Sequence, residues 1–182
     1  MNKKEIRENI SEKLKKLDTS EKHRKDEIIY SKVIRNSLYQ KCKSLFIFVS
    51  YKNEVNTHNI IKHAIDNGKT VAVPVILSLD EGMIAVRING MEQLKENKYG
   101  ILEPVLNNEN ILVPESIDLV IVPGAAFDKN GGRVGYGAGM YDKFLKSINP
   151  KAKKVAIAYE FQVLDYVPME PHDIYVDEVI KD

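Results

Sequence analysis

The sequence is poor in cysteine and in long apolar runs. Its 182 residues include one cysteine, Cys42, which cannot form an intrachain disulfide. The longest apolar runs, such as LFIFV, are far too short to cross a bilayer. The opening stretch MNKKEIRENISEKL also lacks the apolar core of a secretory signal. We therefore expect a cytosolic protein with no membrane partner.

The sequence also lacks an excess of charge of either sign. It has 27 basic and 26 acidic side chains, for a net charge of +1. Nothing in this balance favours a polyanionic partner, so we expect no nucleic-acid binding. Apolar residues make up 43% of the chain, which is ordinary for a globular protein, and the length fits one domain covering residues 1–182.

Two common kinds of catalytic site are missing as well. His58 and His63 are five positions apart, which is the wrong spacing for two zinc ligands on one helical face, so we predict no zinc site. No GxSxG nucleophile motif occurs. We expect Cys42 to be a core residue rather than a nucleophile.

Hydrophobic periodicity predicts alternating helices and strands. Apolar residues recur at helical spacing from 3 to 17, from the cap cluster 18–20 to about Gln40, from a cap at Thr57 to a stop at Asn67-Gly68, and from 139 to 147. Short apolar runs predict strands at 44–50, 70–76, 84–88, 116–123, 154–159 and 174–179, whereas 90–115 reads as loops with a single helical turn. This order predicts an α/β fold: one three-layer, Rossmann-like domain with a mostly parallel open sheet.

The stretch VPGAAFDKNGGRVGYGAGMYDKFL, residues 122–145, lies between a strand and a helix, and five of the ten glycines cluster in its short run 131–139. In parallel α/β folds, ligands bind beyond the carboxyl ends of strands. Glycines let backbone N–H groups converge on an anion, and the start of the following helix adds to the attraction. The spacing matches neither the Walker loop nor the dinucleotide fingerprint. A phosphate site and a glycine-rich surface loop therefore both remain open on these residues alone.

Charged residues near this stretch also allow two interpretations each. Arg133 could pair with phosphoryl oxygens or be a solvated cation. Asp142 could bind magnesium or stabilise the first turn of a helix, and Asp173 could be a turn residue. Glu54 could recognise a polar ligand or face solvent. Lys3 and Arg7, one helical turn apart, could point into one cleft or be ordinary surface charges.

A family resemblance favours the functional interpretations. The stretch PGAAFDKNGGRVGYGAGMYDKFL resembles the signature of 5-formyltetrahydrofolate cyclo-ligases, also called methenyltetrahydrofolate synthetases. The likeness extends over nearly the whole chain through KKEIR, VSYKNEVNT, GKTVAVP, YGILEP, DLVIVPGAAFD, IAYEFQ and PHDIYVD.

The resemblance implies an enzyme that uses ATP and Mg²⁺ to convert 5-formyltetrahydrofolate to 5,10-methenyltetrahydrofolate, releasing ADP and phosphate. It assigns catalysis to Lys3, Arg7 and Arg133. It also implies two sets of binding residues and two metal ligands. ATP would contact Lys3, Arg7, Arg133, Val134, Gly135, Tyr136, Gly137, Ala138, Gly139, Met140 and Tyr141; the folate would contact Val49, Glu54, Tyr136, Gly137, Ala138, Gly139 and Met140; the magnesium ligands would be Asp142 and Asp173.

Two other functions remain as alternatives. A sugar-phosphate isomerase on a related scaffold would use the same loop for a phosphate without needing ATP. A non-catalytic module would bind nucleotide or folate without turnover. We expect 5-formyltetrahydrofolate and ATP as the partners of a monomer.

Overall fold

The structure, a computed structural model, describes residues 1–97 and 100–182. Residues 98 and 99 belong to the predicted loop segment 90–115, and residue 99 is also the first of the family stretch YGILEP; both lie outside the described residues.

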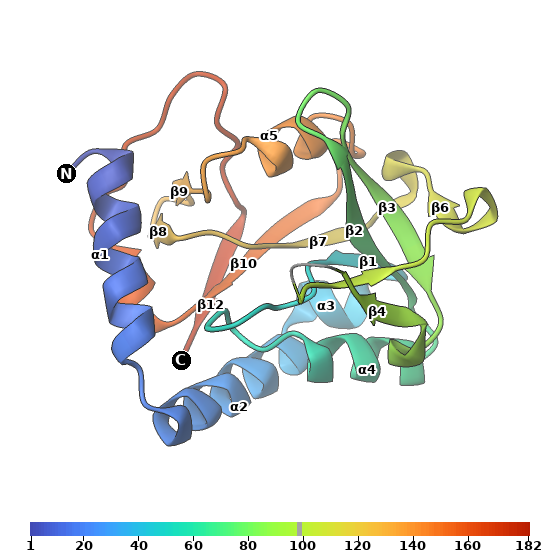
Figure 1. Cartoon of the computed structure of the whole chain (residues 1–182), viewed down its shortest axis with the longest axis horizontal. Coiled ribbons are helices and arrows are strands. Elements are labelled where there is room, and N and C mark those ends of the chain that lie inside the picture. The colour runs from blue at the N-terminus through green and yellow to red at the C-terminus, as the bar shows by residue number, and fades with distance from the viewer. Residues whose placement is uncertain (98–99) are drawn as a thin grey trace.

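A seven-stranded sheet in the order β12-β10-β7-β1-β2-β3-β6 forms the centre of the molecule (Figure 1). Neighbouring strands are parallel from β12 to β2. Strand β3 pairs antiparallel with β2, and β6 pairs antiparallel with β3. Two small sheets, β11-β8-β9 and β4-β5, lie outside it. The strands are β1 (Ser44–Ile47), β2 (Thr70–Ser78), β3 (Gly82–Ile88), β4 (Leu94–Glu96), β5 (Leu102–Pro104), β6 (Ile111–Leu112), β7 (Leu119–Val122), β8 (Ala126–Asp128), β9 (Arg133–Val134), β10 (Lys153–Ala158), β11 (Val163–Leu164) and β12 (Glu178–Lys181).

Helices cover both faces of this sheet, with α2, α3 and α4 on one face and α5 on the other (Figure 1). The α-helices are α1 (Lys3–Lys16), α2 (Thr19–Arg35), α3 (Ser37–Lys41), α4 (His58–Asp66) and α5 (Met140–Leu145). The 3₁₀ helices are η1 (Met91–Gln93), η2 (Asn108–Asn110), η3 (Pro114–Ser116) and η4 (Glu160–Gln162).

The central strands are buried on both faces, because successive side chains of a strand point to opposite sides. In β1, Leu45 and Ile47 pack in the cluster beneath α2 and α4, whereas Phe46 packs against α5, where its ring centroid lies 4.4 Å from that of Phe144. Continuous apolar runs such as LFI therefore predict these strands correctly.

The strand order places two loops side by side. The chain leaves β1 toward β2 on one side, and later returns to form β7 on the other side. The loops that follow β1 and β7 consequently start at neighbouring carboxyl ends, at the topological switch point where α/β folds bind ligands. The first loop carries Glu54 and the second carries the glycine-rich stretch.

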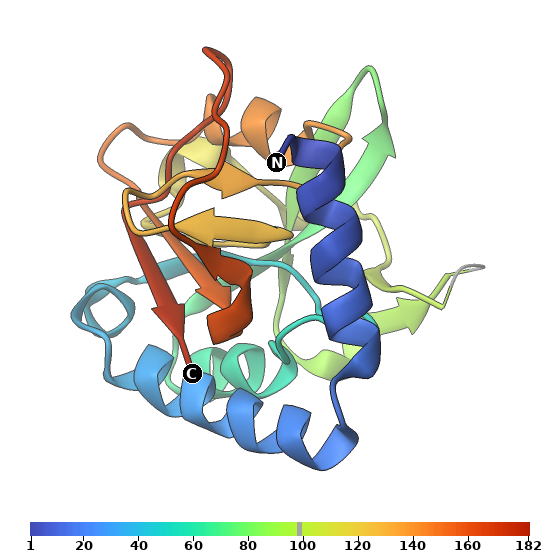
Figure 2. The same ribbon diagram turned by 90° about the vertical axis from the view of Figure 1, so that its left-hand side faces the viewer.

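Helix α1 stands apart from the layers over the central sheet. Its buried Ile6 and Ile10 pack with Ala126, Val134 and Val167, next to the small sheet β11-β8-β9 (Figure 2). This packing brings the N-terminal turn of α1 to the glycine-rich segment.

The observed elements confirm the predicted α/β class and most predicted elements, with five corrections. The segment 90–115, predicted as loops with a single helical turn, contains the short strands β4, β5 and β6 and the 3₁₀ helices η1 and η2. The predicted second helix ends at Arg35, because the Asn36 side chain accepts from the Leu38 and Tyr39 N–H groups and starts α3. The side chain of Thr57 does not cap α4 as predicted, because its hydroxyl accepts from the Ser50 N–H instead. The last strand covers Glu178–Lys181 rather than 174–179, and α5 covers only Met140–Leu145.

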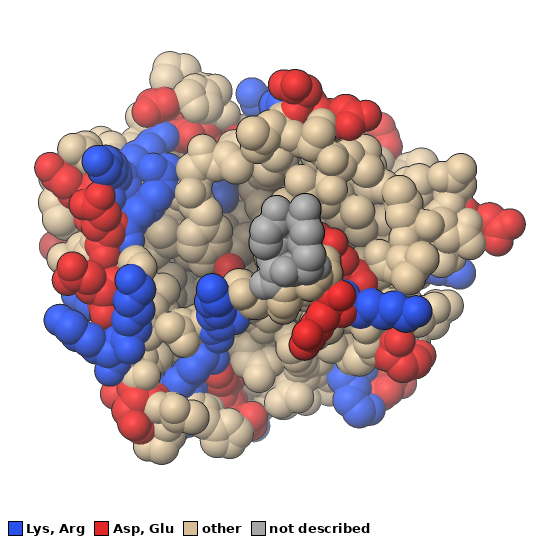
Figure 3. Space-filling model, in the orientation of Figure 1, with Lys and Arg blue, Asp and Glu red and all other residues tan. Residues whose placement is uncertain are grey.

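The surface carries mixed charges. On the face seen in Figure 3, acidic and basic side chains alternate over the side formed by α1 and α2, and much of the centre is uncharged. Within the described residues, no helix is both long enough and apolar enough to span a bilayer.

Candidate active site

The glycine-rich segment, the start of α1 and the chain near residue 170 enclose a cavity of about 700 Å³. Most of the predicted site residues line it. The predicted site residues that line the cavity are Lys3, Arg7, Arg133, Gly135, Tyr136, Gly137, Ala138, Gly139, Met140, Tyr141, Asp142 and Asp173.

Arg133 is the central cation of this cavity. The residue is 4% exposed, and its guanidinium contacts the Asp142 carboxylate (Nη2 to Oδ2, 2.8 Å) and donates from Nη1 to the Pro123 carbonyl (3.2 Å). Its Nε is buried and has no hydrogen-bond partner among the described residues. A buried donor without a partner carries a desolvation penalty.

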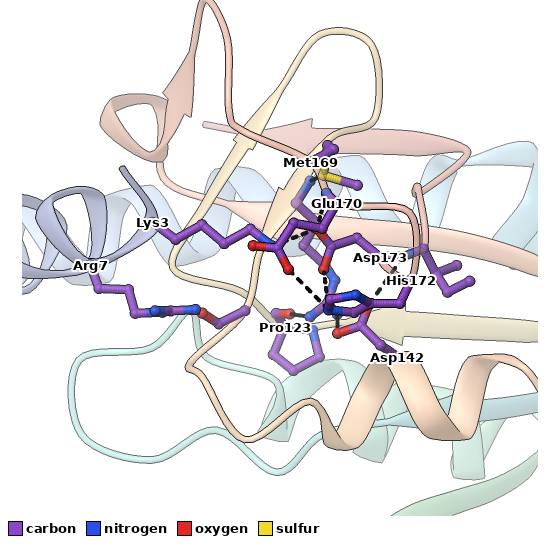
Figure 4. A network of polar contacts seen from close by, with 11 residues as sticks. Lys3, Arg7, Pro123, Asp142, Met169, Glu170, His172 and Asp173 are labelled. Atoms are coloured by element: carbon purple, nitrogen blue, oxygen red, sulfur yellow. Dashed lines mark hydrogen bonds and ion pairs between the residues drawn. The ribbon is translucent and has the colours of Figure 1, made fainter. Parts of the chain in front are cut away.

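Two cations of α1 reach the same cavity (Figure 4). The Lys3 ammonium lies 2.5 Å from Asp173 Oδ2 and 3.5 Å from Glu170 Oε1. Arg7 donates from Nε to the carbonyl of Gly135 at 2.7 Å. The interpretation of these residues as cleft cations therefore fits the structure better than that of ordinary surface charges.

The five glycines of the run 131–139 fall into two groups with different structural roles. Gly131 and Gly132 build a turn around the buried Asp128, whose carboxylate accepts from the Gly132 and Val167 N–H groups. At Gly131 φ is +83°, and a Cβ would lie 2.2 Å from the Val176 carbonyl oxygen. Both positions are structural: the backbone geometry favours glycine at 131, and a Cβ on Gly132 would lie 2.6 Å from Asp128 Oδ2.

The other three glycines border the cavity. A Cβ on Gly135 would lie 3.0 Å from Arg133 Nη1, and one on Gly137, where φ is +114°, would lie 3.7 Å from the Arg7 guanidinium carbon. Side chains here would occupy the space between the cations. The segment thus leaves bare backbone where an anion could approach two guanidinium groups. Because α5 has only six residues, we assign the attraction for anions to these cations and not to the helix.

The predicted magnesium ligands face the cavity but are already engaged. Asp142 pairs with Arg133 and accepts from the Ile174 N–H through Oδ1 (3.1 Å), and Asp173 pairs with Lys3. Burial alone would raise the pKa of Asp173, but hydrogen bonds from Lys3 and the Glu170 N–H hold it below its usual value. Within the described residues, no three His, Cys, Asp or Glu side chains form a metal-binding group.

Glu54 meets the glycine-rich segment through Tyr136. The Glu54 carboxylate accepts from the Tyr51 N–H at 2.8 Å and forms a hydrogen bond with the Tyr136 hydroxyl. Burial raises the pKa of Glu54, although these two hydrogen bonds oppose the shift. Neither Glu54 nor the half-buried Val49 is among the residues that line the cavity. These two predicted folate contacts thus differ from the other five, which line the cavity, and Glu54 is linked to it through Tyr136, a residue that is 55% exposed.

Tyr141 lies between the two groups of predicted contacts. Its hydroxyl is buried without a hydrogen-bond partner in the described part of the chain, and its ring centroid lies 6.0 Å from the guanidinium carbon of Arg133. Burial and the nearby charge of Glu54 raise its pKa, so it remains a hydroxyl donor at neutral pH. Val134 differs from the other predicted contacts, since its side chain is fully buried against α1.

Several cavity residues were not predicted. Glu170 and His172 lie beside Asp173 and contact each other, with His172 Nε2 at 3.2 Å from Glu170 Oε2. The stretch PHD contains His172, so its position next to a predicted site residue was an available signal. Ile76 lines the cavity and is 57% exposed, but nothing in the strand TVAVPVI distinguishes it.

Comparisons with known proteins identify the family of this chain. The model of the 5-formyltetrahydrofolate cyclo-ligase family matches residues 1–182. The chain belongs to this family. The predicted family and the predicted enzyme class are therefore confirmed.

Relatives and solved structures match over nearly the full chain. The mouse 5-formyltetrahydrofolate cyclo-ligase is 32% identical, with 96% of this chain and 91% of the relative covered. A mitochondrial cyclo-ligase of Arabidopsis thaliana is 33% identical over 96% of this chain and 72% of the relative. The structure of Aquifex aeolicus 5,10-methenyltetrahydrofolate synthetase is 30% identical with a TM-score of 0.85, covering 100% of this chain and 90% of that one. The Mycoplasma pneumoniae synthetase is 26% identical with a TM-score of 0.79, covering 99% and 98%.

Proposed function

We propose that this chain, as one cyclo-ligase domain over residues 1–182, converts 5-formyltetrahydrofolate to 5,10-methenyltetrahydrofolate with ATP and Mg²⁺, releasing ADP and phosphate. The family gives the overall conversion. The observation that carries the use of ATP is the buried cation Arg133, which lines a cavity together with Lys3, Arg7 and bare glycine backbone.

The reaction needs ATP because an amide-like formyl oxygen is a poor leaving group. The formyl oxygen attacks the γ-phosphorus, the bond to the β-phosphate oxygen breaks, and ADP leaves. N10 of the folate then attacks the activated formyl carbon and loses its proton, and the carbon–oxygen bond to phosphate breaks. No protein nucleophile is required, which agrees with the absence of a nucleophile motif.

Phosphoryl transfer asks the protein chiefly for positioning and for neutralisation of charge. Asp142 and the Pro123 carbonyl hold Arg133 in the wall of the cavity, where its guanidinium can meet the transferring phosphoryl group. Lys3 and Arg7 supply further positive charge from α1. The buried Tyr141 hydroxyl, between Arg133 and Glu54, can donate to an oxygen at the junction of the two substrates.

The carboxylates fit magnesium only together with phosphate oxygens. Mg²⁺ is commonly held by one or two carboxylates plus substrate phosphates and water. Asp142 and Asp173 line the cavity and would hold the ion there, neutralising charge on the phosphates. In the present structure Asp142 pairs with Arg133 and Asp173 pairs with Lys3. A bound phosphate would pair with these two basic side chains instead, and the two carboxylates would then bind the metal.

The folate would enter beside Tyr136. Tyr136 forms a hydrogen bond with the Glu54 carboxylate, and the residue is 55% exposed. Glu54 and Val49 would then contact the pterin when Tyr136 moves aside. The cytosolic location and the monomeric state remain predictions.

The direct test is to incubate the protein with 5-formyltetrahydrofolate, Mg²⁺ and ATP, and to record methenyl absorbance and ADP release together. We expect one ADP per methenyl product. Folate conversion without ADP release would contradict the proposed use of ATP. ATP binding without any folate turnover would favour the binding module, and a turnover requirement for a sugar phosphate would favour the isomerase.

A further inference from the structure

A buried carboxylate outside the cavity links three segments around Glu54. Asp26, on α2, is 7% exposed. Its Oδ1 accepts from the Tyr159 hydroxyl at 2.8 Å and from the Asn56 N–H at 3.1 Å, and its Oδ2 pairs with Lys22 at 2.7 Å. One side chain therefore joins α2, the end of β10 and the loop that carries Glu54.

Tyr159 extends this link to the backbone of Glu54 itself. The tyrosine is fully buried directly after the last residue of β10, and its hydroxyl lies 3.4 Å from the Glu54 carbonyl oxygen. Burial and the hydrogen bond to Asp26 raise its pKa, so the hydroxyl remains a donor at neutral pH. Asp26 and Tyr159 thus hold the loop on both sides of Val55.

The same tyrosine is tied to the glycine-rich side of the site. Its N–H donates to Gln162 Oε1 at 2.9 Å, and Gln162 Nε2 donates to the carbonyls of Gly124 (3.2 Å) and Ala125 (3.0 Å). Gln162 is 4% exposed. The loops after β1 and β7 are therefore fixed to a common support.

A purely stabilising role does not explain this arrangement well. A buried ion pair adds little net stability compared with apolar side chains of similar size, because desolvation offsets the attraction. A carboxylate that accepts from two segments does fix their relative position, which an apolar contact cannot do to the same accuracy. Within the loop, Ser50 and Thr57 exchange hydrogen bonds near its ends, and Tyr51 and Glu54 are hydrogen-bonded to each other.

We propose that Asp26 and Tyr159 are positioning residues that hold the Glu54 loop in the conformation that binds the folate. This inference rests on the proposed function for its catalytic consequence. Tyr159→Phe should raise the KM for 5-formyltetrahydrofolate about tenfold, as expected for one misplaced hydrogen-bonding group. The KM for ATP should stay within about twofold, because the Tyr159 hydroxyl contacts Asp26 and Glu54, which do not line the cavity.

The chain offers a matched control for this substitution. Tyr39 is also buried, 2% exposed, and its hydroxyl pairs with His63 Nδ1 at 2.8 Å between α3 and α4. Tyr39→Phe removes an equivalent buried hydroxyl and should change neither KM. Asp26→Asn keeps an oxygen acceptor for Tyr159 and Asn56. Its KM for the folate should therefore lie between that of the wild type and that of Asp26→Ala.

Hydrogen exchange separates this inference from the proposed function. In Tyr159→Phe, the amides of residues 50–57 should exchange about tenfold faster without any substrate, whereas Tyr39→Phe should leave them unchanged. Unchanged exchange, or equal increases in both KM values, would overturn the positioning role. Faster exchange in a protein whose wild type does not convert the folate would retain the loop support and reject the proposed function.

Discussion

The Arg133 guanidinium lies 2.8 Å from the Asp142 carboxylate, and the arginine side chain is almost fully buried. An arginine cannot lose its proton in this environment, so the neighbouring carboxylate is what makes its burial tolerable. The two residues stand at opposite ends of the glycine-rich segment that borders the cavity. The ion pair therefore fixes both the conformation of this segment and the direction of the guanidinium.

Asp142→Asn tests this pairing. The substitution keeps the size of the side chain but leaves Arg133 without a counter-charge, so we expect the unfolding free energy to fall by about 1–3 kcal/mol. The concentration of Mg²⁺ needed for half-maximal turnover should also rise. Urea unfolding and a magnesium titration of turnover measure the two effects.

Asp66→Asn is the matched control. Asp66 pairs with Lys62 at 2.6 Å on the exposed surface of α4, so its loss should change stability by roughly 0.5 kcal/mol or less. Lower stability of Asp142→Asn with an unchanged magnesium requirement would reject the metal role and leave Asp142 as the residue that positions Arg133. Equal stability of the two variants would contradict the pairing.

Gly135→Ala probes the bare backbone beside Arg133. The added Cβ would lie 3.0 Å from Arg133 Nη1 and should displace the guanidinium by a few tenths of an ångström. Because phosphoryl transfer depends on position, we expect kcat to fall by about tenfold or more with little change in stability.

Gly68→Ala should behave in the opposite way. Gly68 has a φ of +74° after α4, and a Cβ there would meet nothing within 4 Å. This variant should lose about 1 kcal/mol of stability from backbone strain and keep its kcat. A Gly135→Ala enzyme with wild-type kcat would show that the space beside Arg133 is not used.

Lys3→Met should change the acid dependence of stability. The pKa of Asp173 is held below its usual value in the folded protein, despite burial, by Lys3 and the Glu170 N–H. A carboxyl group with a lowered folded pKa stabilises the fold above its unfolded pKa, near 4, and this contribution is lost as pH falls through the folded pKa. The wild type should therefore be more stable than Lys3→Met at pH 7, and the difference should shrink below about pH 4. A difference independent of pH would mean that Lys3 acts through packing alone.

Glu54→Gln should separate stability from function. Burial raises the pKa of Glu54, so its neutral form is more favoured in the folded protein than in the unfolded chain. The corresponding contribution to stability is present at low pH and is lost as pH rises through the folded pKa. Glutamine can still accept from Tyr51 and Tyr136 without carrying a charge. We expect this variant to be at least as stable as the wild type at pH 7, and to bind 5-formyltetrahydrofolate about tenfold more weakly. Wild-type affinity for the folate would remove Glu54 from the substrate site.

The sequence predicted those parts of the fold that depend on local patterns. The apolar runs of β1 and β7 and the Asn67-Gly68 stop of α4 follow from periodicity and backbone preference. The break between α2 and α3 was missed although Asn36 is a good capping residue, because the apolar repeat continues across it.

The parts that were not predicted depend on distant contacts. The hydrogen bond between Glu54 and Tyr136 exists because β1 and β7 are neighbours, and no local pattern encodes that strand order. Asp26 appears in the sequence as one more acidic residue of an amphipathic helix, and only its contact with Tyr159 reveals it. The roles of Lys3, Arg7 and Asp173 came from the family resemblance, since isolated charges have ordinary surface explanations.

Calorimetric titration with ATP tests the central claim most directly, namely that Arg133, Lys3 and Arg7 form a triphosphate site beside the folate pocket. With Mg²⁺ present, the wild type should bind one ATP per chain, and Lys3→Ala should bind it about tenfold more weakly while its affinity for 5-formyltetrahydrofolate stays within about twofold. If the folded wild type binds no ATP, with or without 5-formyltetrahydrofolate, the claim is contradicted.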